Sequence, residues 1–223
     1  MMIKDNLKRI EATLKPGVRL VAVSKYQPIA ALQEAYGAGQ RAFGESHVQE
    51  LVVKHEALPK DVEWHFIGHL QTNKVKYMAS FVSLIHSVDS LKLLKEINKQ
   101  ALKAGRVIDV LLQLHVAAEE TKFGLTQHEV VEMLESDDFI ALKNVRVVGL
   151  MAMATNTEDE EQVAMEFESV RQFYHVLKDG YFSGKPEFKE ISMGMSGDYL
   201  IAQKYESTLV RVGSSIFGER IYE

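Results

Sequence analysis

The residue with the clearest chemical potential is a lysine at the end of an apolar run. Lys25 follows Val18–Ser24, a stretch of β-branched and apolar residues between Pro16–Gly17 and Pro28. This pattern predicts a strand buried on both faces, as in a parallel sheet, and ligands bind at the carboxyl ends of such strands. An amine at the mouth of an apolar barrel loses its proton more easily and can form an imine with an aldehyde. Taken alone, the stretch favours the alternative, a solvated lysine that opens a loop.

Two segments near the C-terminus have the residue types of a phosphate site. Met193–Asp198 (MGMSGD) follows an expected strand and precedes a helix, so its glycines, Ser196 and the helix amides can face an anion. Gly213 and Ser214 or Ser215 follow the next expected strand. Each segment alone is typical of an ordinary turn. The loops after strands seven and eight of an α/β barrel commonly bind phosphate, so together the two segments predict a phosphate site.

Arg211 and the segment His65–Lys74 also place polar side chains at the ends of expected strands. Arg211 stands between Val210 and Val212, where a charge is costly to bury without a partner. It either faces a ligand inside the barrel or pairs with an acidic neighbour, and the first interpretation is favoured. The segment His65–Lys74 (HFIGHLQTNK) also suggests the ligand face, although surface loops are commonly polar as well. The histidines lack metal-ligand spacing, and neither a serine-hydrolase elbow nor a GxGxxG loop is present.

The elements that position these residues alternate along the chain. Expected strands cover 18–25, 41–46, 63–68, 81–86, 107–115, 145–151, 188–193 and 208–213. Expected helices cover 6–14, 29–36, 48 to before Pro59, a segment around 73–77, 91–102, a segment capped by Thr126, 157–177 and 199–205. This order predicts one (β/α)8 barrel domain over residues 1–223 with an extra N-terminal helix, and a doubly wound open sheet is the alternative.

The composition limits which partners and which cellular compartment are expected. The 223 residues carry a formal net charge of −5 and no cysteine, so disulfides and thiolate metal sites are excluded and a reducing compartment is expected. The charged N-terminus lacks the apolar core of a signal peptide, and no apolar run reaches membrane-spanning length. We expect a cytoplasmic protein that binds neither nucleic acid nor membranes.

Motifs in register across the chain resemble those of the pyridoxal phosphate homeostasis proteins, single-domain relatives of the alanine racemase barrel. They are Ala22–Lys25 (AVSK), Phe43–Glu45 (FGE) with Val48–Glu50 (VQE), His65–Lys74, His86–Asp89 (HSVD), Gly149–Met151 (GLM), Ser192–Ser196 (SMGMS) with Asp198, and Val210–Gly213 (VRVG) with Phe217–Gly218.

The resemblance implies that Lys25 holds pyridoxal 5'-phosphate (PLP) as a Schiff base. It implies that Arg211 faces the pyridine nitrogen, where an arginine disfavours a protonated ring and weakens the cofactor as an electron sink. The phosphate-binding positions it implies are Ser196, Gly197, Gly213 and Ser214. Further positions expected near the cofactor are Ser46, which stands where the family often has asparagine, His69, Ser87 and Met193.

Three functions follow from these residues. The first is a non-catalytic monomer that stores PLP or delivers it to PLP-dependent apoenzymes. The second is a PLP-dependent amino-acid racemase, with Lys25 and a loop tyrosine or histidine as its two bases. The third is a barrel for a sugar phosphate in which Lys25 is incidental. The chain ends ten residues after Gly213, so we expect no second domain over the site and an open mouth that suits cofactor exchange.

Overall fold

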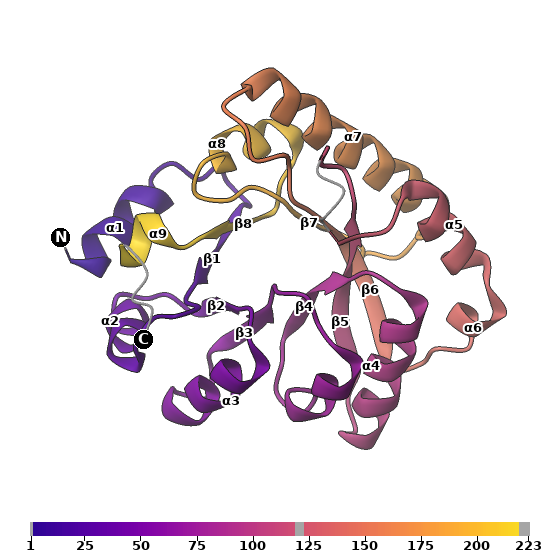
Figure 1. Ribbon diagram of the computed structural model, residues 1–223, viewed down its shortest axis with the longest axis horizontal. Coiled ribbons are helices and arrows are strands. Elements are labelled where there is room, and N and C mark those ends of the chain that lie inside the picture. Colours follow the sequence, from indigo (N-terminus) through magenta and orange to yellow (C-terminus); the bar gives the residue numbers. More distant parts are fainter. Residues whose placement is uncertain (1, 119–122, 219–223) are drawn as a thin grey trace.

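The strands of this computed structural model, which describes residues 2–118 and 123–218, form one closed parallel barrel. Each strand pairs in parallel with the next, and β8 pairs with β1 to close the barrel (Figure 1). The strands are β1 (Arg19–Val23), β2 (Ala42–Glu45), β3 (Glu63–Phe66), β4 (Leu84–Val88), β5 (Ile108–Leu114), β6 (Val145–Ala152), β7 (Glu190–Ser192) and β8 (Leu209–Val212). The (β/α)8 prediction is therefore confirmed, and the open-sheet alternative is wrong.

Helices follow the strands and cover the outside of the barrel. They are α1 (Ile3–Glu11), α2 (Ile29–Gly37), α3 (Val48–Ala57), η1 (Thr72–Tyr77), α4 (Leu91–Lys103), α5 (Gln127–Glu135), α6 (Asp137–Ile140), α7 (Glu160–Asp179), α8 (Tyr199–Ala202), η2 (Gln203–Tyr205) and α9 (Ser214–Phe217). The expected extra N-terminal helix is α1. The cap expected at Thr126 is a capping box with Glu129, and Asp159 caps α7 by accepting from the backbone N–H groups of Glu161 and Gln162.

Apolar side chains fill two layers, one inside the barrel and one between the strands and the helices. The interior layer is small and contains Val21, Leu84, Leu111, Val148, Met151 and Leu209. The outer layer holds most of the core, including Trp64, Phe66, Val210 and Val212. Since side chains alternate along a strand, the residues two positions from the interior set also face the barrel axis. This alternation directs Arg211 inward, two residues after Leu209.

The expected helix around 73–77 is a 3-10 helix, η1. The fourth strand covers Leu84–Val88 and not the expected range 81–86. The strand begins at Leu84, whereas Phe81 precedes it and stacks on His55 of α3 at a centroid distance of 3.7 Å. Apolar residues before a strand can thus pack against a helix that lies earlier in the chain, here α3. The short helices α6 and α9 were not expected.

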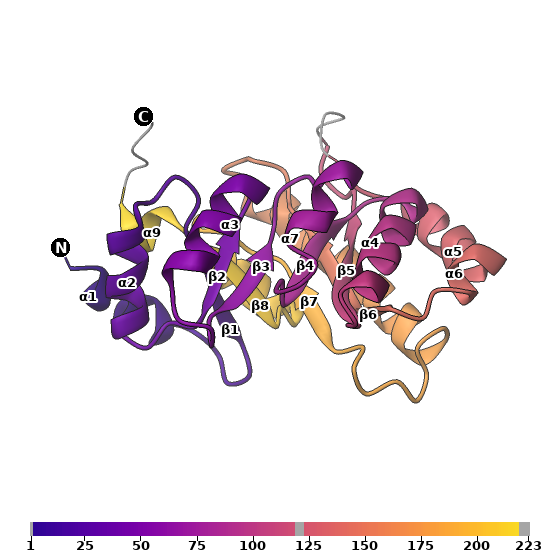
Figure 2. The ribbon, with the colours of Figure 1, turned by 90° about the horizontal axis from the view of Figure 1, so that it is seen from below.

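Figure 2 shows the two ends of the barrel. The loop that joins α7 to β7 lies at the end opposite α9, which follows β8 and marks the carboxyl ends of the strands. Within residues 2–118 and 123–218, no helix is long and apolar enough to cross a bilayer.

Candidate functional site

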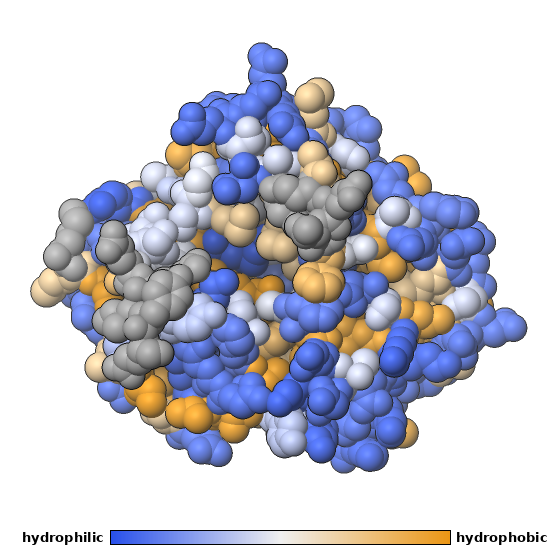
Figure 3. Space-filling model, viewed as in Figure 1, coloured by the Kyte–Doolittle hydropathy of each residue, from blue (hydrophilic) through white to orange (hydrophobic). Residues whose placement is uncertain are grey.

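The carboxyl end of the barrel holds a cavity of about 530 Å³ that Lys25 lines. Lys25 is half-buried and follows β1 by two residues, so the strand sets its place on the rim. Ser46 and His69, from the loops after β2 and β3, line the same cavity, as do Gln113 of β5 and Met153 after β6. Figure 3 looks onto this end, where apolar and polar residues surround a hollow near the barrel axis. The cavity therefore lies at the face where barrels of this kind bind ligands.

The loops after β7 and β8 meet beside the end of β1. Ser196 Oγ lies 3.4 Å from the backbone nitrogen of Gly213, which donates to it, and 3.4 Å from Ser214 Oγ. A Cβ atom on Gly213 would lie 3.1 Å from the carbonyl oxygen of Val23, so the β8 loop packs closely against β1. Gly197 is exposed in the same turn. The structure thus groups the hydroxyl and amide donors expected to bind phosphate beside Val23, which precedes Lys25 by two residues.

Arg211 lies inside the barrel and is 4% exposed. Its Nη1 donates to the carbonyl oxygen of Ser192 at 2.8 Å and to Ser192 Oγ at 2.6 Å, and its Nη2 donates to the carbonyl oxygen of Ala152 at 2.9 Å. Burial lowers the pKa of Arg211 to about 10, and the nearby Asp198 carboxylate acts in the opposite direction. The guanidinium stays charged at neutral pH and is held by backbone and hydroxyl oxygens of β6 and β7.

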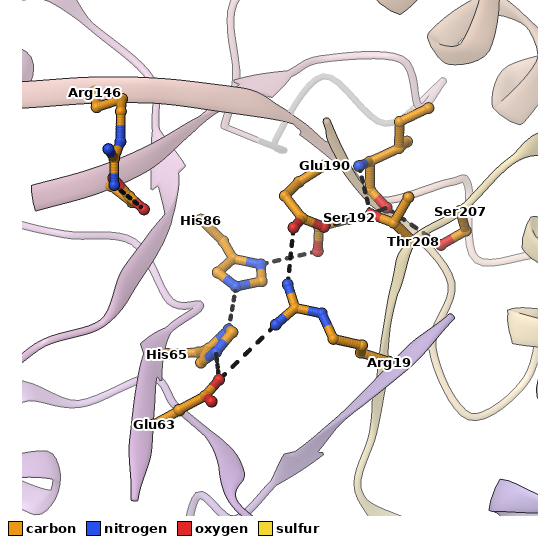
Figure 4. A network of polar contacts seen from close by, with 11 residues as sticks. Arg19, Glu63, His65, His86, Arg146, Glu190, Ser192, Ser207 and Thr208 are labelled. Carbon is orange, nitrogen blue, oxygen red and sulfur yellow. Dashed lines mark hydrogen bonds and ion pairs between the residues drawn. The ribbon is translucent and has the colours of Figure 1, made fainter. Parts of the chain in front are cut away.

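A chain of polar side chains continues from Ser192 along the barrel interior (Figure 4). Ser192 Oγ lies 2.8 Å from His86 Nδ1, and His86 Nε2 lies 2.8 Å from His65 Nδ1. His65 Nε2 is 3.9 Å from Glu63 at the amino end of the barrel. Burial lowers the pKa of His65 and lowers that of His86 well below its ordinary value, so both imidazoles are neutral at neutral pH.

Ion pairs line a second cavity, of about 260 Å³, at the amino end of the barrel. Arg19 Nη2 donates to Glu190 at 2.8 Å, and Arg146 pairs with Asp109 at 2.7 Å (Figure 4). These contacts join β1 to β7 and β5 to β6. The paired charges at this end suit a structural role, because barrel active sites lie at the other end.

The four further positions implied by the resemblance lie in different places. Ser46 and His69 line the Lys25 cavity, and His69 pairs with Asp89 at 3.2 Å while its ring stacks on Phe123. Ser87 is buried in β4 and Met193 is buried in the outer core, and neither lines that cavity. The cofactor contacts of all four stay predictions.

Sequence reasoning missed a buried ionic group under the Lys25 segment. Lys54 of α3 is 3% exposed, and its Nζ donates to Glu45 at 2.8 Å, Glu50 at 2.6 Å and the carbonyl oxygen of Ser24 at 2.6 Å. Burial raises the pKa of the Glu45 carboxyl to about 7, against the opposing effect of Lys54. One signal was available, because Lys54 follows Val48 and Leu51 on the apolar stripe of α3.

The sequence matches known proteins over nearly its whole length. The family model described as alanine racemase, N-terminal domain, matches residues 2–221. A pyridoxal phosphate homeostasis protein of Aquifex aeolicus is 42% identical over 205 residues, which cover 92% of this chain and 88% of that protein. Another, of Schizosaccharomyces pombe, is 40% identical over 208 residues, covering 91% and 84% of the two chains.

Solved structures agree with the sequence matches. PipY of Synechococcus elongatus with PLP bound superposes with a TM-score of 0.87 at 34% identity, covering 97% of this chain and 100% of that chain. An alanine racemase of Clostridium difficile in complex with cycloserine gives a TM-score of 0.78 at 12% identity, and this chain covers 60% of it. The second likeness shows the shared barrel fold alone.

Proposed function

Because this chain belongs to the family of pyridoxal phosphate homeostasis proteins, we propose that it binds PLP at the carboxyl end of its barrel. We further propose that it holds the cofactor on Lys25 in the cytoplasm and passes it to PLP-dependent apoenzymes without turning over a substrate. The observation that carries the proposal is the meeting of the β7 and β8 loops beside the strand that ends near Lys25.

The residues at this end fit the chemistry of PLP. When bound, PLP supplies an aldehyde that forms a Schiff base with a primary amine, and a phosphate dianion that needs hydrogen-bond donors. Lys25 lines the cavity at the end of β1, and its amine would hold the aldehyde carbon. Ser196, Gly197, Gly213 and Ser214 would hold the phosphate, since their hydroxyls and amides gather in one place.

Arg211 supports a carrier rather than a catalyst. In the proposed complex its buried guanidinium faces the pyridine nitrogen, and a fixed cation there opposes protonation of the ring. A ring without that proton is a weaker electron sink, which disfavours carbanion chemistry at a bound amino acid. The guanidinium is held by Ser192 and Ala152, so its charge does not depend on the ligand.

The mouth of the cavity also supports exchange of the cofactor. Tyr26, His47, His69 and Phe123 line the cavity and are exposed, so the cavity opens to solvent. A site that protects a carbanion excludes water, whereas a site that loads and releases its ligand needs an open path. We propose that the protein acts as a monomer, which sedimentation equilibrium with and without PLP tests.

The first experiment measures the bond to Lys25. Wild-type protein mixed with PLP should gain a visible absorption band that borohydride bleaches, and mass spectrometry should place the reduced adduct on Lys25. Lys25→Ala should abolish the band. Lys74→Ala is the matched control, because Lys74 lines the same cavity, and it should keep the adduct. An adduct on another lysine, or none, would contradict the proposal.

The second experiment separates carrier from enzyme. Loaded wild-type protein should restore activity to a PLP-dependent apoenzyme, and the transferred PLP should not exceed the amount loaded. Incubation with L-alanine should yield no multiple-turnover formation of D-alanine. Sustained racemisation would replace the carrier proposal with the racemase alternative.

A further inference from the structure

The two residues that flank Lys25 are both tied to one pair of side chains on α3. Lys54 Nζ donates to the carbonyl oxygen of Ser24 at 2.6 Å, and Glu50 Oε1 accepts from the backbone nitrogen of Tyr26 at 2.6 Å. The same Glu50 oxygen accepts from Lys54 Nζ at 2.6 Å. One ammonium and one carboxylate therefore connect the backbone on both sides of Lys25.

Glu45 adds a third attachment from β2. Its Oε1 accepts from Lys54 Nζ at 2.8 Å and from Ser24 Oγ at 2.5 Å. The three hydrogens of the Lys54 ammonium thus have three acceptors, on Ser24, Glu45 and Glu50, which satisfies the donor capacity of a buried lysine. Lys54 and Glu45 are 3% and 0% exposed, so solvent does not compete for the contact between them.

The conformation of the Lys25 segment explains why it needs such support. Tyr26 has φ +63°, in the left-handed region, which costs a non-glycine residue about 1 kcal/mol or more. A residue holds this conformation only when surrounding contacts enforce it. The backbone bond from Tyr26 to Glu50 is one such contact, and it fixes the direction in which the chain leaves Lys25.

An apolar side chain at position 54 would pack there without the cost of desolvating charge. Replacing buried ion pairs by apolar residues is often neutral or stabilising, so stability alone does not account for Lys54. A methionine would fill similar volume but would release the carbonyl oxygen of Ser24 and the carboxylate of Glu50. What Lys54 supplies in particular is the geometry of the Ser24–Tyr26 segment.

We propose that Lys54, together with Glu50, is a positioning residue that holds the Lys25 amine at the cavity by fixing the backbone of Ser24 and Tyr26. The inference rests on the proposed role of Lys25 as the PLP-binding amine. It predicts that loss of the network changes Schiff base formation and leaves phosphate binding unchanged. Loss of the network impairs Schiff base formation, whereas the phosphate donors on the β7 and β8 loops, which lie outside the network, keep their affinity.

The test compares Lys54→Met and Glu50→Ala with Glu56→Ala, an exposed position on the same helix. Stopped-flow absorbance measures the rate and extent of Schiff base formation with PLP. Competition by pyridoxine 5'-phosphate, which has no aldehyde, measures phosphate-dependent binding. Trace acetylation of the cofactor-free proteins, followed by mass spectrometry, measures the reactivity of Lys25 relative to Lys74.

We expect Lys54→Met and Glu50→Ala to lower the equilibrium constant for Schiff base formation at least tenfold and to change the relative acetylation of Lys25 at least threefold. Affinity for pyridoxine 5'-phosphate should stay within threefold of wild type, and Glu56→Ala should match wild type within twofold in every measurement. If Lys54→Met does not fold, Glu50→Ala decides, because it keeps the Lys54–Glu45 pair.

Two outcomes would overturn the inference. One is a folded variant with wild-type Schiff base formation and wild-type Lys25 acetylation. The other is an equal loss of pyridoxine 5'-phosphate affinity, which would indicate general damage to the site. If wild-type protein itself forms no Schiff base, the proposed function fails instead, and the acetylation of cofactor-free Lys25 still decides the positioning role.

Discussion

His86 Nδ1 lies 2.8 Å from the hydroxyl oxygen of Ser192, at the point where the interior polar chain meets Arg211. Glu63 lies at one end of this interior polar chain and Arg211 at the other, and the contacts at both ends indicate the same direction for its hydrogen bonds. Nε2 of neutral His65 faces the Glu63 carboxylate 3.9 Å away, where an N–H group is favoured over a lone pair, so His65 Nδ1 accepts from His86 Nε2. His86 Nδ1 then accepts from the Ser192 hydroxyl, whose oxygen accepts from Arg211. Each imidazole therefore has one tautomer.

Replacing the shared hydroxyl should therefore cost more than one hydrogen bond. Ser192→Ala leaves His86 Nδ1 without its donor and removes one acceptor from Arg211. Both groups are buried, so we expect a loss of about 2 kcal/mol in the free energy of unfolding. Urea denaturation measures this loss, with Ser169→Ala on the surface helix α7 as control. Equal urea midpoints for the two variants would show that the Ser192 hydroxyl does not stabilise the interior polar chain.

The buried histidines should make the fold sensitive to acid. Since burial puts the pKa of His86 in the folded protein well below that in the unfolded chain, the unfolded state gains protons as pH falls below about 6.5. The contribution of His86 is fully present above that pH, and it is lost by up to about 1.4 kcal/mol per pH unit below it. His86→Gln should reduce this slope in urea titrations between pH 6.5 and 5, whereas His128→Gln, at an exposed position, should retain it.

The raised pKa of Glu45 should make the free energy of unfolding fall as pH rises, which is opposite to the effect of His86. Its pKa in the folded protein is raised to about 7, so the folded state binds a proton that the unfolded chain releases at about 4.5. This contribution to stability is fully present below pH 4.5 and is lost as pH rises through about 7. Relative to Glu45→Gln, we expect wild-type protein to lose about 2–3 kcal/mol between pH 4.5 and 8. Glu56→Gln, at an exposed site on α3, should follow wild type, and parallel curves for wild type and Glu45→Gln would refute the assignment.

One barrel glycine should tolerate no side chain. Gly149 of β6 has φ +155°, and a Cβ atom there would overlap the carbonyl oxygen of Glu190 on β7. Gly149→Ala must separate two paired strands, so we expect a loss of at least about 3 kcal/mol or failure to fold. Gly37→Ala is the control, because a Cβ at that end of α2 meets open space. Thermal denaturation of Gly149→Ala within 3 °C of wild type would contradict this reading.

The phosphate donors can be tested through a ligand that lacks phosphate. Ser196→Ala removes the hydroxyl nearest the Gly213 amide, and a hydrogen bond to a charged group contributes about 1.5 kcal/mol. We expect the Kd for PLP to rise about tenfold and the Kd for pyridoxal to stay unchanged. Ser183→Ala, in the exposed loop after α7, provides the control. A similar loss for both ligands would place Ser196 outside the phosphate site.

The strands and most helices follow from local patterns, whereas the exceptions depend on packing between elements. Alternating runs of apolar strand and amphipathic helix are sufficient to predict the barrel order. Phe81 looked like part of a strand, but its ring stacks on His55, a contact that sequence spacing does not contain. The four-residue helices α6 and α9 are too short to show a period.

The residues of the candidate site also differ in how far local sequence patterns predict them. Sequence motifs are enough to predict Lys25 and Ser196 as site residues, because glycines and strand ends have local signatures, and both assignments stay predictions. The Lys54 network did not emerge, since a lysine in a helix is usually solvated, and only its place on the apolar stripe of α3 distinguishes it. The sequence leaves two alternatives for Arg211, a ligand inside the barrel or an acidic partner. The structure places its guanidinium inside the barrel on oxygens of Ser192 and Ala152, contacts that sequence spacing does not contain, and its contact with a ligand stays a prediction.

The first helix of the chain is fastened to the element that follows the last strand. Asn6 Nδ2 donates to the carbonyl oxygen of Ile216 at 2.8 Å, and α1 lies beside α9 (Figure 1). Because α9 begins at Ser214, α1 supports a loop that we assign to phosphate recognition. A deletion of α1, or a bulky group attached to it, would therefore weaken phosphate binding at the opposite end of the sequence.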